Sequence, residues 1–324
     1  MPRSDTVFIL QQALTASVPL GTAGLGELVA ERAGIINVGL EGLMLIGCIA
    51  AYVGAHAAGT AAGGAAGIAA AALASMALAA VFAFMTVWWR TDQIVTGTAI
   101  NLLAAGLSTT LWAYLEPRMA ELPIGTGFER HPLGALANIP IVGPILFDQY
   151  ALFYVLVVAL LLVGLVLSRT RLGLILRALG EAPDACDAMG IDVRWWRTGA
   201  VVFTGLCAGV AGSYLSIMRD HQFAPNMTGG QGFLVLALVI FGRWRIGGLI
   251  AGCVFFGAVE NLQQFLQSSE SFRLFLQAHV GIERLPYQYF KMLPYLAALV
   301  ALGAFARGRA GPACLGQPWP TGER

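Results

Sequence analysis

The first residues that could do chemistry form a polar cluster inside an otherwise hydrophobic part of the chain. Between Gly26 and Gly42 the cluster holds three carboxylates, one arginine and one asparagine, namely Glu27, Glu31, Arg32, Asn37 and Glu41. Inside a membrane such groups are expensive, so they usually face a cavity or the interior of a helix bundle. Glycine-broken helices are also how transporters expose backbone polar groups to a translocation path. A solvated turn between two helices is the alternative, and it weighs more for Glu27, Glu31 and Arg32 than for Asn37 and Glu41.

A set of polar residues flanks or interrupts three apolar stretches. The set comprises Asn37, Glu41, Gln93, Asn101, Glu260 and Asn261. The first four bracket two predicted spans, and the last two lie near the outer end of a third. We expect several of them to line an inward cavity and to contact a polar, uncharged solute, because sites built to hydrogen-bond a hydroxyl discriminate well. The alternative is interhelical hydrogen bonding, which stabilises membrane bundles by about 0.6 kcal/mol per pair.

The segment from Arg169 to Arg197 carries five arginines. Within it, Pro183 and nearby acids favour a short helix that begins near Glu181, and Gly190 supplies a stop. A short amphipathic helix between two membrane spans could dock in a groove on a soluble partner. The residues assigned to this helix and its approach are Arg177, Gly180, Glu181, Ala185, Gly190 and Ile191. A solvated loop rich in arginine is the alternative.

Membrane helices must position these residues, because the composition leaves no other class. Of 324 residues, 57% are hydrophobic and 11% are charged, against about 25% charged in soluble domains; the mean hydropathy is +0.73. A spanning helix needs about 20 apolar residues, so we predict an all-α polytopic protein with about 8–10 transmembrane helices, some broken or re-entrant. The candidate spans are 7–25, 35–57, 66–88, 94–114, 150–168, 198–218, 246–266 and 286–306. The shorter run 232–242 is a tilted helix or a half-helix that re-enters the membrane.

The basic residues predict the orientation of the chain. Cytoplasmic loops carry an excess of arginine and lysine, which predicts that 169–197 is a cytoplasmic loop and that the C-terminus lies in the cytoplasm. The segment 115–149 then becomes an irregular external loop. The side of the N-terminus stays open, because a re-entrant Gly26–Gly42 would change the number of crossings. Residues 1–306 form a single transmembrane domain, and the Gly/Pro-rich tail 307–324 is predicted to be disordered.

Several catalytic patterns are missing from the sequence. Lys291 is the only lysine and Met292 follows it, so the chain has no Gly-x-x-x-x-Gly-Lys-[Ser/Thr] phosphate loop. It has no Gly-x-Ser-x-Gly or His-Glu-x-x-His motif, and its five cysteines lack metal-ligand spacing. The net charge of +1 suggests no nucleic-acid partner. We therefore expect no enzymatic activity, no metal and no cofactor in this chain; if transport is driven by ATP, the ATPase is another chain.

In the polar cluster 26–42, the arginine-rich segment 169–197 and the apolar run 232–242, the sequence resembles the bacterial ABC permeases of the ribose and branched-chain amino-acid superfamily. The resemblance is closer to the branch for nucleosides, in which simple-sugar-type assignments are also common. It covers roughly residues 20 to 305 in collinear order. The matching segments are Glu31–Gly42, Thr91–Gly97 with Asn101, Arg171–Gly173, Arg177–Glu181, Ala188–Ile191 and Gly232–Trp244.

The resemblance implies a permease that pairs with a second, related permease in the bacterial inner (plasma) membrane. Two ATPase domains would sit inside and bind ATP and Mg²⁺, and a binding protein would sit outside. Glu181 to Ile191 would form the coupling helix. The solute would be a nucleoside, with a simple sugar or a branched-chain amino acid as alternatives. The Arg219-Asp220-His221 cluster, the 115–149 loop and the tail depart from the family pattern, which leaves the substrate open.

Two further questions concern assembly and mechanism. A single coupling-helix candidate and the missing phosphate loop predict that the chain works as half of a membrane dimer. The resemblance favours a heterodimer over a homodimer. An ion-coupled secondary transporter is the main rival from another mechanism class. It would need carboxylates deep within helices, for which Glu41 and Glu260 are the candidates.

Overall fold

The protein is a bundle of long helices, here in a computed structural model that describes residues 5–119, 130–132, 134–268, 277, 286, 289–290, 292–305 and 311–319. Seven helices of this part are long and apolar enough to cross a membrane. They cover Val7–Arg32, Leu40–Gly59, Ala62–Trp88, Gln93–Pro117, Ala151–Arg169, Val193–Arg219 and Ile246–Ser268. Two shorter helices, α9 and α13, accompany them. The all-α polytopic class predicted from the sequence is confirmed.

The elements follow one another in a simple order. The long helices are α1 (Asp5–Arg32), α2 (Leu40–Ala83), α3 (Gln93–Met119), α5 (Ala151–Arg169), α8 (Val193–Ser213) and α10 (Ile246–Ser268). The short helices are α4 (Val142–Leu146), α6 (Arg171–Glu181), α7 (Pro183–Ala188), α9 (Gln231–Phe241) and α13 (Leu293–Phe305). A 3-10 turn covers Gly134–Asn138, and π-helical turns extend α2 over Phe84–Trp88 and α8 over Tyr214–Arg219. Two short strands, β1 (Arg130–Pro132) and β2 (Asp148–Tyr150), pair antiparallel with Arg130 opposite Tyr150.

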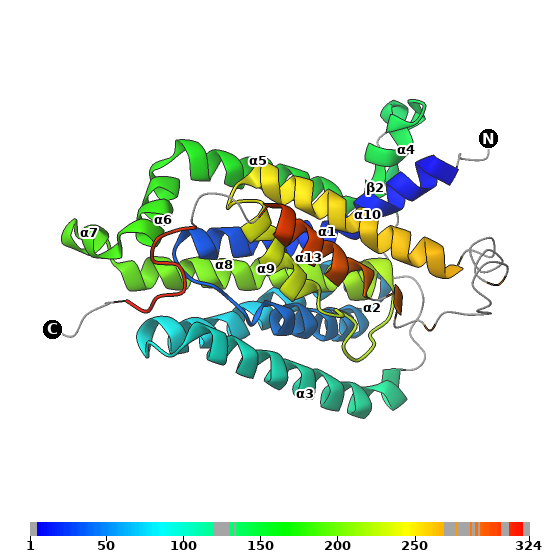
Figure 1. Ribbon diagram of the computed structural model, residues 1–324. Coiled ribbons are helices and arrows are strands. Elements are labelled where there is room, and N and C mark those ends of the chain that lie inside the picture. The colour runs from blue at the N-terminus through cyan, green and yellow to red at the C-terminus, as the bar shows by residue number, and fades with distance from the viewer. Residues whose placement is uncertain are drawn as a thin grey trace.

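The helices run roughly along one long axis of the molecule (Figure 1). α6, α7 and the C-terminal segment 311–319 lie at one end, called here the α7 end. The last turns of α10 and the start of α1 lie at the opposite end. α2 bends at Gly59, whose φ of 72° and ψ of −172° are not helical, and this bend separates two spans within one continuous element.

Small residues bring the central helices into close contact. An added Cβ at Gly47 would lie 2.8 Å from the Cα of Gly209, so α2 and α8 touch through their backbones. Gly205 and Gly212 of α8 meet α2 in the same way. Such glycine contacts are a common basis of helix packing in membranes, because they let helix backbones approach closely.

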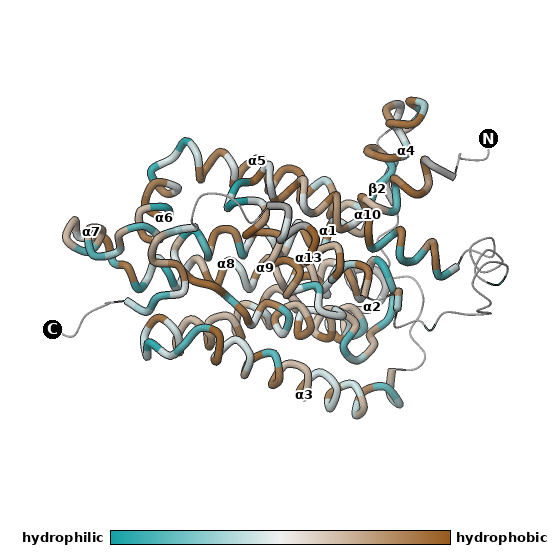
Figure 2. The backbone as a smooth tube through the Cα atoms, viewed as in Figure 1, coloured by the Kyte–Doolittle hydropathy of each residue, from teal (hydrophilic) through white to brown (hydrophobic). Residues whose placement is uncertain are grey.

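The outer helices expose apolar side chains. α5 presents Leu161 and Leu165, which are 69% and 57% exposed, and α3 presents Leu102, which is 71% exposed. Figure 2 shows hydrophobic residues along most of α5 and hydrophilic colour toward its junction with α6. A surface of this kind suits lipid or a membrane partner and not water.

The break between the first two spans is shorter than predicted. The sequence suggested a first span of 7–25 followed by a broken Gly26–Gly42, whereas α1 continues to Arg32 and only 33–39 leaves the helix. Gly26 does not end α1, because it serves packing: an added Cβ would lie 2.8 Å from the Cα of Thr204 on α8. A buried helix satisfies its own backbone, so glycines within it need not break it.

The last predicted span and the external loop lie partly outside the described residues. Of the predicted span 286–306, the structure describes α13 from Leu293 to Phe305 and a few residues before it. Of 115–149, residues 120–129 and 133 lie outside the description. The rest of that loop is fixed to α1, because Gln11 Nε2 donates to the carbonyl of Asp148 at 2.8 Å and Thr15 Oγ1 donates to Gln149 Oε1 at 3.0 Å.

The C-terminal segment differs from its prediction. Residues 307–324 were expected to be disordered, but 311–319 pack against the α7 end. The backbone N–H of Cys314 donates to the carbonyl of Gly180 at 2.8 Å, and that of Gly316 donates to Gly34 at 3.1 Å. Composition missed this order because the stabilising partners come from distant parts of the chain.

Candidate functional site

The break between α1 and α2 is held by buried side chains. Glu27 Oε1 accepts from the N–H of Asn37 at 2.9 Å, and Gln93 Oε1 accepts from that of Ile36 at 2.8 Å. Asn101 Oδ1 accepts from the N–H of Gly42 at 2.8 Å, while its Nδ2 donates to the carbonyl of Val38 at 2.9 Å. Non-helical backbone in a membrane protein needs such partners. The structure thus brings Asn37, Gln93 and Asn101 together, as supports of the break.

The same region keeps unused hydrogen-bonding atoms. Within the described residues, Glu27 Oε2, Asn37 Nδ2 and Gln93 Nε2 are buried and have no hydrogen-bond partner. Glu31 Oε1 is in the same state, although Glu31 Oε2 accepts from Trp244 Nε1 at 2.5 Å. Buried polar atoms without partners are uncommon and call for an explanation. They make the break a polar spot within the apolar bundle.

Glu41 joins the first turn of α2 to the start of α9. Its carboxylate accepts from the N–H groups of Gly230 at 2.8 Å and Gly232 at 2.6 Å, and from Thr228 Oγ1 at 2.6 Å. The N-terminus of a helix carries partial positive charge and unpaired N–H groups, which is where a carboxylate is stabilised. Gly230, with φ of 88°, gives the chain the left-handed turn that points these groups at Glu41.

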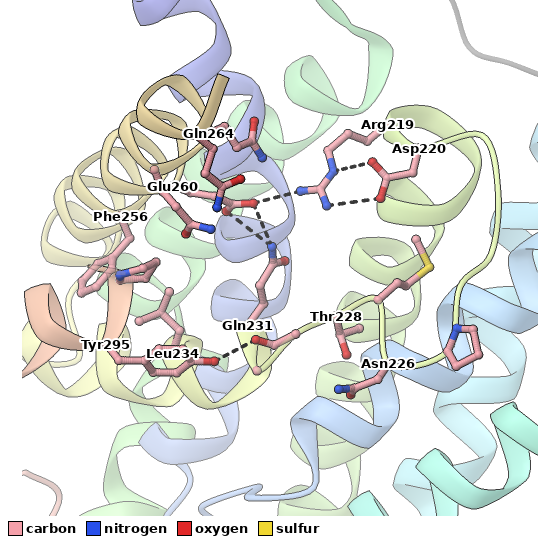
Figure 3. A pocket seen from close by; sticks show the side chains of 17 residues that line it. Arg219, Asp220, Asn226, Thr228, Gln231, Leu234, Phe256, Glu260, Gln264 and Tyr295 are labelled. Atoms are coloured by element: carbon pink, nitrogen blue, oxygen red, sulfur yellow. Dashed lines mark hydrogen bonds and ion pairs between the residues drawn. The ribbon is translucent and has the colours of Figure 1, made fainter. Parts of the chain in front are cut away.

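A polar pocket of about 470 Å³ lies beside the start of α9 (Figure 3). Arg219 donates to Glu260 Oε1 at 3.2 Å and to Asp220 Oδ1 at 3.0 Å. Gln231 Nε2 reaches the Glu260 carboxylate at 3.3 and 3.4 Å. The wall comprises Arg219, Asp220, Pro225, Asn226, Met227, Thr228, Gly229, Gly230, Gln231, Leu234, Phe256, Glu260, Gln263, Gln264, Gln267, Pro294 and Tyr295. Its volume is typical of sites for small molecules.

The described wall of the pocket combines hydrogen-bonding capacity with one arginine and two carboxylates. Gln231 Oε1 is buried and has no partner within the described residues. Gln263, Gln264 and Gln267 add three amides from α10. The one cation, Arg219, is already paired with two carboxylates, so the described wall offers no unpaired positive charge for an anionic solute.

The predicted path residues therefore separate into groups. Asn37, Gln93 and Asn101 support the break, and Glu41 binds the start of α9. Glu260 lines the pocket. Its neighbour in sequence, Asn261, donates through Nδ2 to the carbonyl of Ile9 at 2.5 Å and so joins α10 to α1 instead. In the part of the chain that the structure describes, the pocket beside α9 holds only Glu260 of the six.

Sequence reasoning missed most of the pocket. Gln263, Gln264 and Gln267 follow Glu260 at spacings of three, four and seven residues, which places them on one face of a helix. That spacing was visible in the sequence and could have marked a polar face. Gln231 and Tyr295 carried no such signal, since their role depends on what lies opposite them.

A short helix is present where the coupling helix was predicted, with one correction to its start. α7 spans Pro183–Ala188 and is followed by Gly190 with φ of 80°. Glu181 belongs to α6, and Ala182 separates the two helices with φ of −148°. The cause is the ring of Pro183, which disfavours helical geometry in the residue before it.

The residues assigned to the coupling helix divide between its exposed and packed sides. Glu181, Ala185 and Gly190 are exposed, as is Met189 at 78%. Ile191 packs on a small cluster formed by Leu179, Val193 and the α7 residue Cys186.

Two approach residues in α6 lie closer to the bundle. Arg177 is half-buried and bonds the carbonyl of Gly173 at 3.2 Å. Gly180 is buried so close to α1 that a Cβ there would collide with the carbonyl of Arg32. α7 is therefore held from one side and accessible from the other.

Comparison with known proteins places this geometry in a family. The model of the family "Branched-chain amino acid transport system / permease component" matches residues 9–302. A Lactococcus lactis nucleoside ABC transporter permease is 32% identical over 92% of this chain and 92% of its own. A Bacillus subtilis guanosine ABC transporter permease is 30% identical over 98% of this chain and 97% of its own.

The description of a third relative names a different solute. A protein of Haloferax volcanii, provisionally assigned as a glucose ABC transporter permease, is 36% identical over 80% of this chain and 78% of its own. No solved structure matches the chain significantly. The family match includes most or all of each membrane helix discussed above, and it confirms the resemblance inferred from the sequence motifs. The chain therefore belongs to the permease-component family of the branched-chain amino acid transport system, and it is a multi-pass membrane transport subunit.

Proposed function

We propose that this chain is the membrane permease of an ABC importer whose solute is a nucleoside. The observation that carries the solute class is the pocket of about 470 Å³ with its glutamines and its fully paired arginine. Amides donate and accept hydrogen bonds at once, which matches the hydroxyls of a ribose and the edge of a base. The two nucleoside-type relatives, each similar over nearly the whole chain, support the same choice.

The charges of the pocket argue against anionic solutes. An amino acid or a phosphorylated solute needs an unpaired cation for its anionic group, and Arg219 is already bound to Glu260 and Asp220. A simple sugar is the second candidate, because it also offers hydroxyl groups and no charge, and the Haloferax relative supports it. The difference between the two is the planar base, which Phe256 and Tyr295 in the pocket wall could contact.

The α7 end is proposed to face the cytoplasm and to meet the ATPase subunit. α7 is short, its outer side is exposed, and its base is fixed to the bundle. These properties suit a helix that binds a partner with its exposed side and transmits the partner's movement to the helix bundle. The C-terminus would then also be cytoplasmic. The opposite end of the molecule, where the last turns of α10 line the pocket, would meet an extracytoplasmic binding protein.

A second permease is proposed to complete the transporter. The described residues offer one candidate docking helix, α7, whereas an ABC importer uses two ATPase domains, so two permeases are needed. A non-identical sister permease is favoured, and two copies of this chain are the alternative. Purification through a tag on this chain after co-expression with the neighbouring genes, followed by native mass measurement, distinguishes the two. A transport-competent monomer contradicts both.

Uptake by the purified assembly tests the solute. Proteoliposomes that hold the chain with its co-purified partners should accumulate labelled guanosine or uridine only with ATP, and excess unlabelled nucleoside should compete while glucose should not. The reverse competition would select the sugar. Uptake by the chain alone, driven by an ion gradient without ATPase partners, would establish a secondary transporter instead.

A further inference from the structure

The C-terminal segment 311–319 connects two parts of the fold that are remote in sequence. Its Cys314 N–H bonds Gly180, the residue before the last of α6, and its Gly316 N–H bonds Gly34, in the break between α1 and α2. Gly34 has a φ of 92°, a conformation that side chains other than glycine rarely adopt. The segment therefore touches both the base of α7 and the backbone of the break.

A buried arginine ties the same three parts together. Arg197 of α8 is 2% exposed, and its guanidinium donates to the carbonyls of Ala33 at 3.1 Å, Leu179 at 3.4 Å and Gln317 at 3.2 Å. Within the described residues, no carboxylate lies within ion-pair distance of it. A buried charge without a counter-ion is costly unless it is well hydrogen-bonded. The three carbonyls must therefore stay close to their positions around Arg197.

The last described residue of the segment, Trp319, contacts α7 itself. Trp319 Nε1 donates to Asp184 Oδ1 at 2.8 Å, and Asp184 lies in the first turn of α7. The ring of Trp319 packs on the cluster of Leu179, Cys186 and Val193, which joins α7 to α6 and α8. This contact is local and half-exposed, so the membrane helices do not depend on it.

We propose that residues 311–319, with Arg197, form a clasp that positions α7 relative to the break between α1 and α2. α7 and the break then move as one body when a partner pushes on α7. From the break, Glu41 leads directly to Gly230 and Gly232, where α9 begins and where Gly230 lines the pocket. The inference rests on the proposed role of α7 as the ATPase-docking helix, and Trp319 acts in it as a positioning residue.

The first experiment measures whether the clasp holds α7. Cys186 belongs to α7, packs against Leu179 and Val193, and is 4% exposed. Membranes containing the complete set of subunits are treated with a small maleimide, and the peptide containing Cys186 is followed by mass spectrometry. Trp319→Ala should raise the labelling rate of Cys186 about fivefold, the factor expected from losing one solvent-exposed hydrogen bond. An unchanged rate overturns the clasp.

The second experiment measures what the clasp does, as solute transported per ATP hydrolysed. Trp319→Ala and Asp184→Ala should lower this ratio about fivefold while the amount of assembled complex stays the same. Asp184→Asn should retain most of it, since the amide oxygen still accepts from Trp319. A merely structural defect would reduce the yield of complex and leave the ratio of the surviving complex unaltered, which overturns the positioning role.

A third variant separates this inference from the proposed role of α7. Asp187→Pro breaks α7 and leaves the clasp residues in place. If Asp187→Pro abolishes coupling while Trp319→Ala raises labelling without changing the ratio, the clasp inference alone is overturned. If neither variant changes the ratio, the proposed role of α7 has failed and the inference fails with it.

Discussion

Glu41 and Gly232 lie 191 positions apart in the chain, yet the Glu41 carboxylate accepts the Gly232 N–H at 2.6 Å. An added Cβ at Gly232 would lie 2.5 Å from the Cα of Glu41. The contact therefore requires a carboxylate on one side and a residue without a side chain on the other. It fixes the start of α9, and with it one wall of the pocket.

Gly232→Ala should disrupt this contact. The new methyl group collides with the backbone of α2, which cannot move because Gly42 is bonded to Asn101 at 2.8 Å. We expect a loss of about 1–3 kcal/mol in stability, typical of overpacking, seen as a lower melting temperature of the purified complex. Gly247→Ala is the matched control, because an added Cβ there meets nothing within 4 Å. Equal melting temperatures for the two variants would contradict the packing described here.

Glu41→Ala should be more damaging than Glu41→Gln. Alanine leaves the Gly230 and Gly232 N–H groups and the Thr228 hydroxyl without their shared acceptor, whereas glutamine keeps one oxygen. Hydrogen bonds to a charged group contribute about 1.5–3 kcal/mol each. The yield of folded protein and the uptake rate should both fall in the order wild type, Gln, Ala. Full uptake by Glu41→Ala would show that the N-terminus of α9 needs no anion.

Glu260→Gln and Asn261→Leu should have different effects although they are neighbours. Glu260 lines the pocket, so its substitution should raise the apparent KM for uptake several-fold while the folded protein remains intact. Asn261 joins α10 to α1, so its substitution should lower the amount of folded protein and leave the apparent KM unchanged. Size-exclusion profiles and uptake kinetics give the two readings. A raised KM for Asn261→Leu alone would move the solute site away from the described pocket.

Asn101→Leu should behave as a structural variant. It removes the partners of the Val38 carbonyl and the Gly42 N–H, and each unsatisfied buried group costs about 1–3 kcal/mol. We expect less folded protein and an unchanged apparent KM. Thr110→Val on the same helix is the control, since the exposed Thr110 hydroxyl only bonds the Gly106 carbonyl of its own helix. Intact protein with impaired uptake would place Asn101 on the solute path after all.

Asp187→Pro should uncouple ATP hydrolysis from transport. The substitution lies in the second turn of α7, where the helix uses the backbone N–H that proline lacks. Ala185 lies in the first turn, where proline is better tolerated. Proline at position 187 should therefore disrupt α7 more than proline at position 185. Asp187→Ala is the control that removes only the side chain. We expect the proline variant to reach the membrane and to hydrolyse ATP without uptake; normal uptake would exclude α7 as the docking helix.

Much of the fold followed from local patterns. Apolar runs of helical length predicted most of the spans, because a lipid environment requires backbone groups to pair within each segment. Pro183 and Gly190 marked the limits of α7 for equally local reasons, since proline starts and glycine stops a helix. The exact break after α1 could not be predicted. Glycines that permit close packing, such as Gly26, look the same in sequence as glycines that end a helix.

The sequence by itself determined the membrane class, the family motifs and the short helix α7, because each depends on residues close together in the chain. The tertiary structure alone decided what the polar residues do. It directed Asn101 to the backbone of the break, Glu41 to the start of α9, and Asn261 to α1. It also brought Arg219 and Glu260 from separate helices into one pocket. A hydrogen bond or an ion pair depends on what lies opposite a side chain, and helix packing decides that partner.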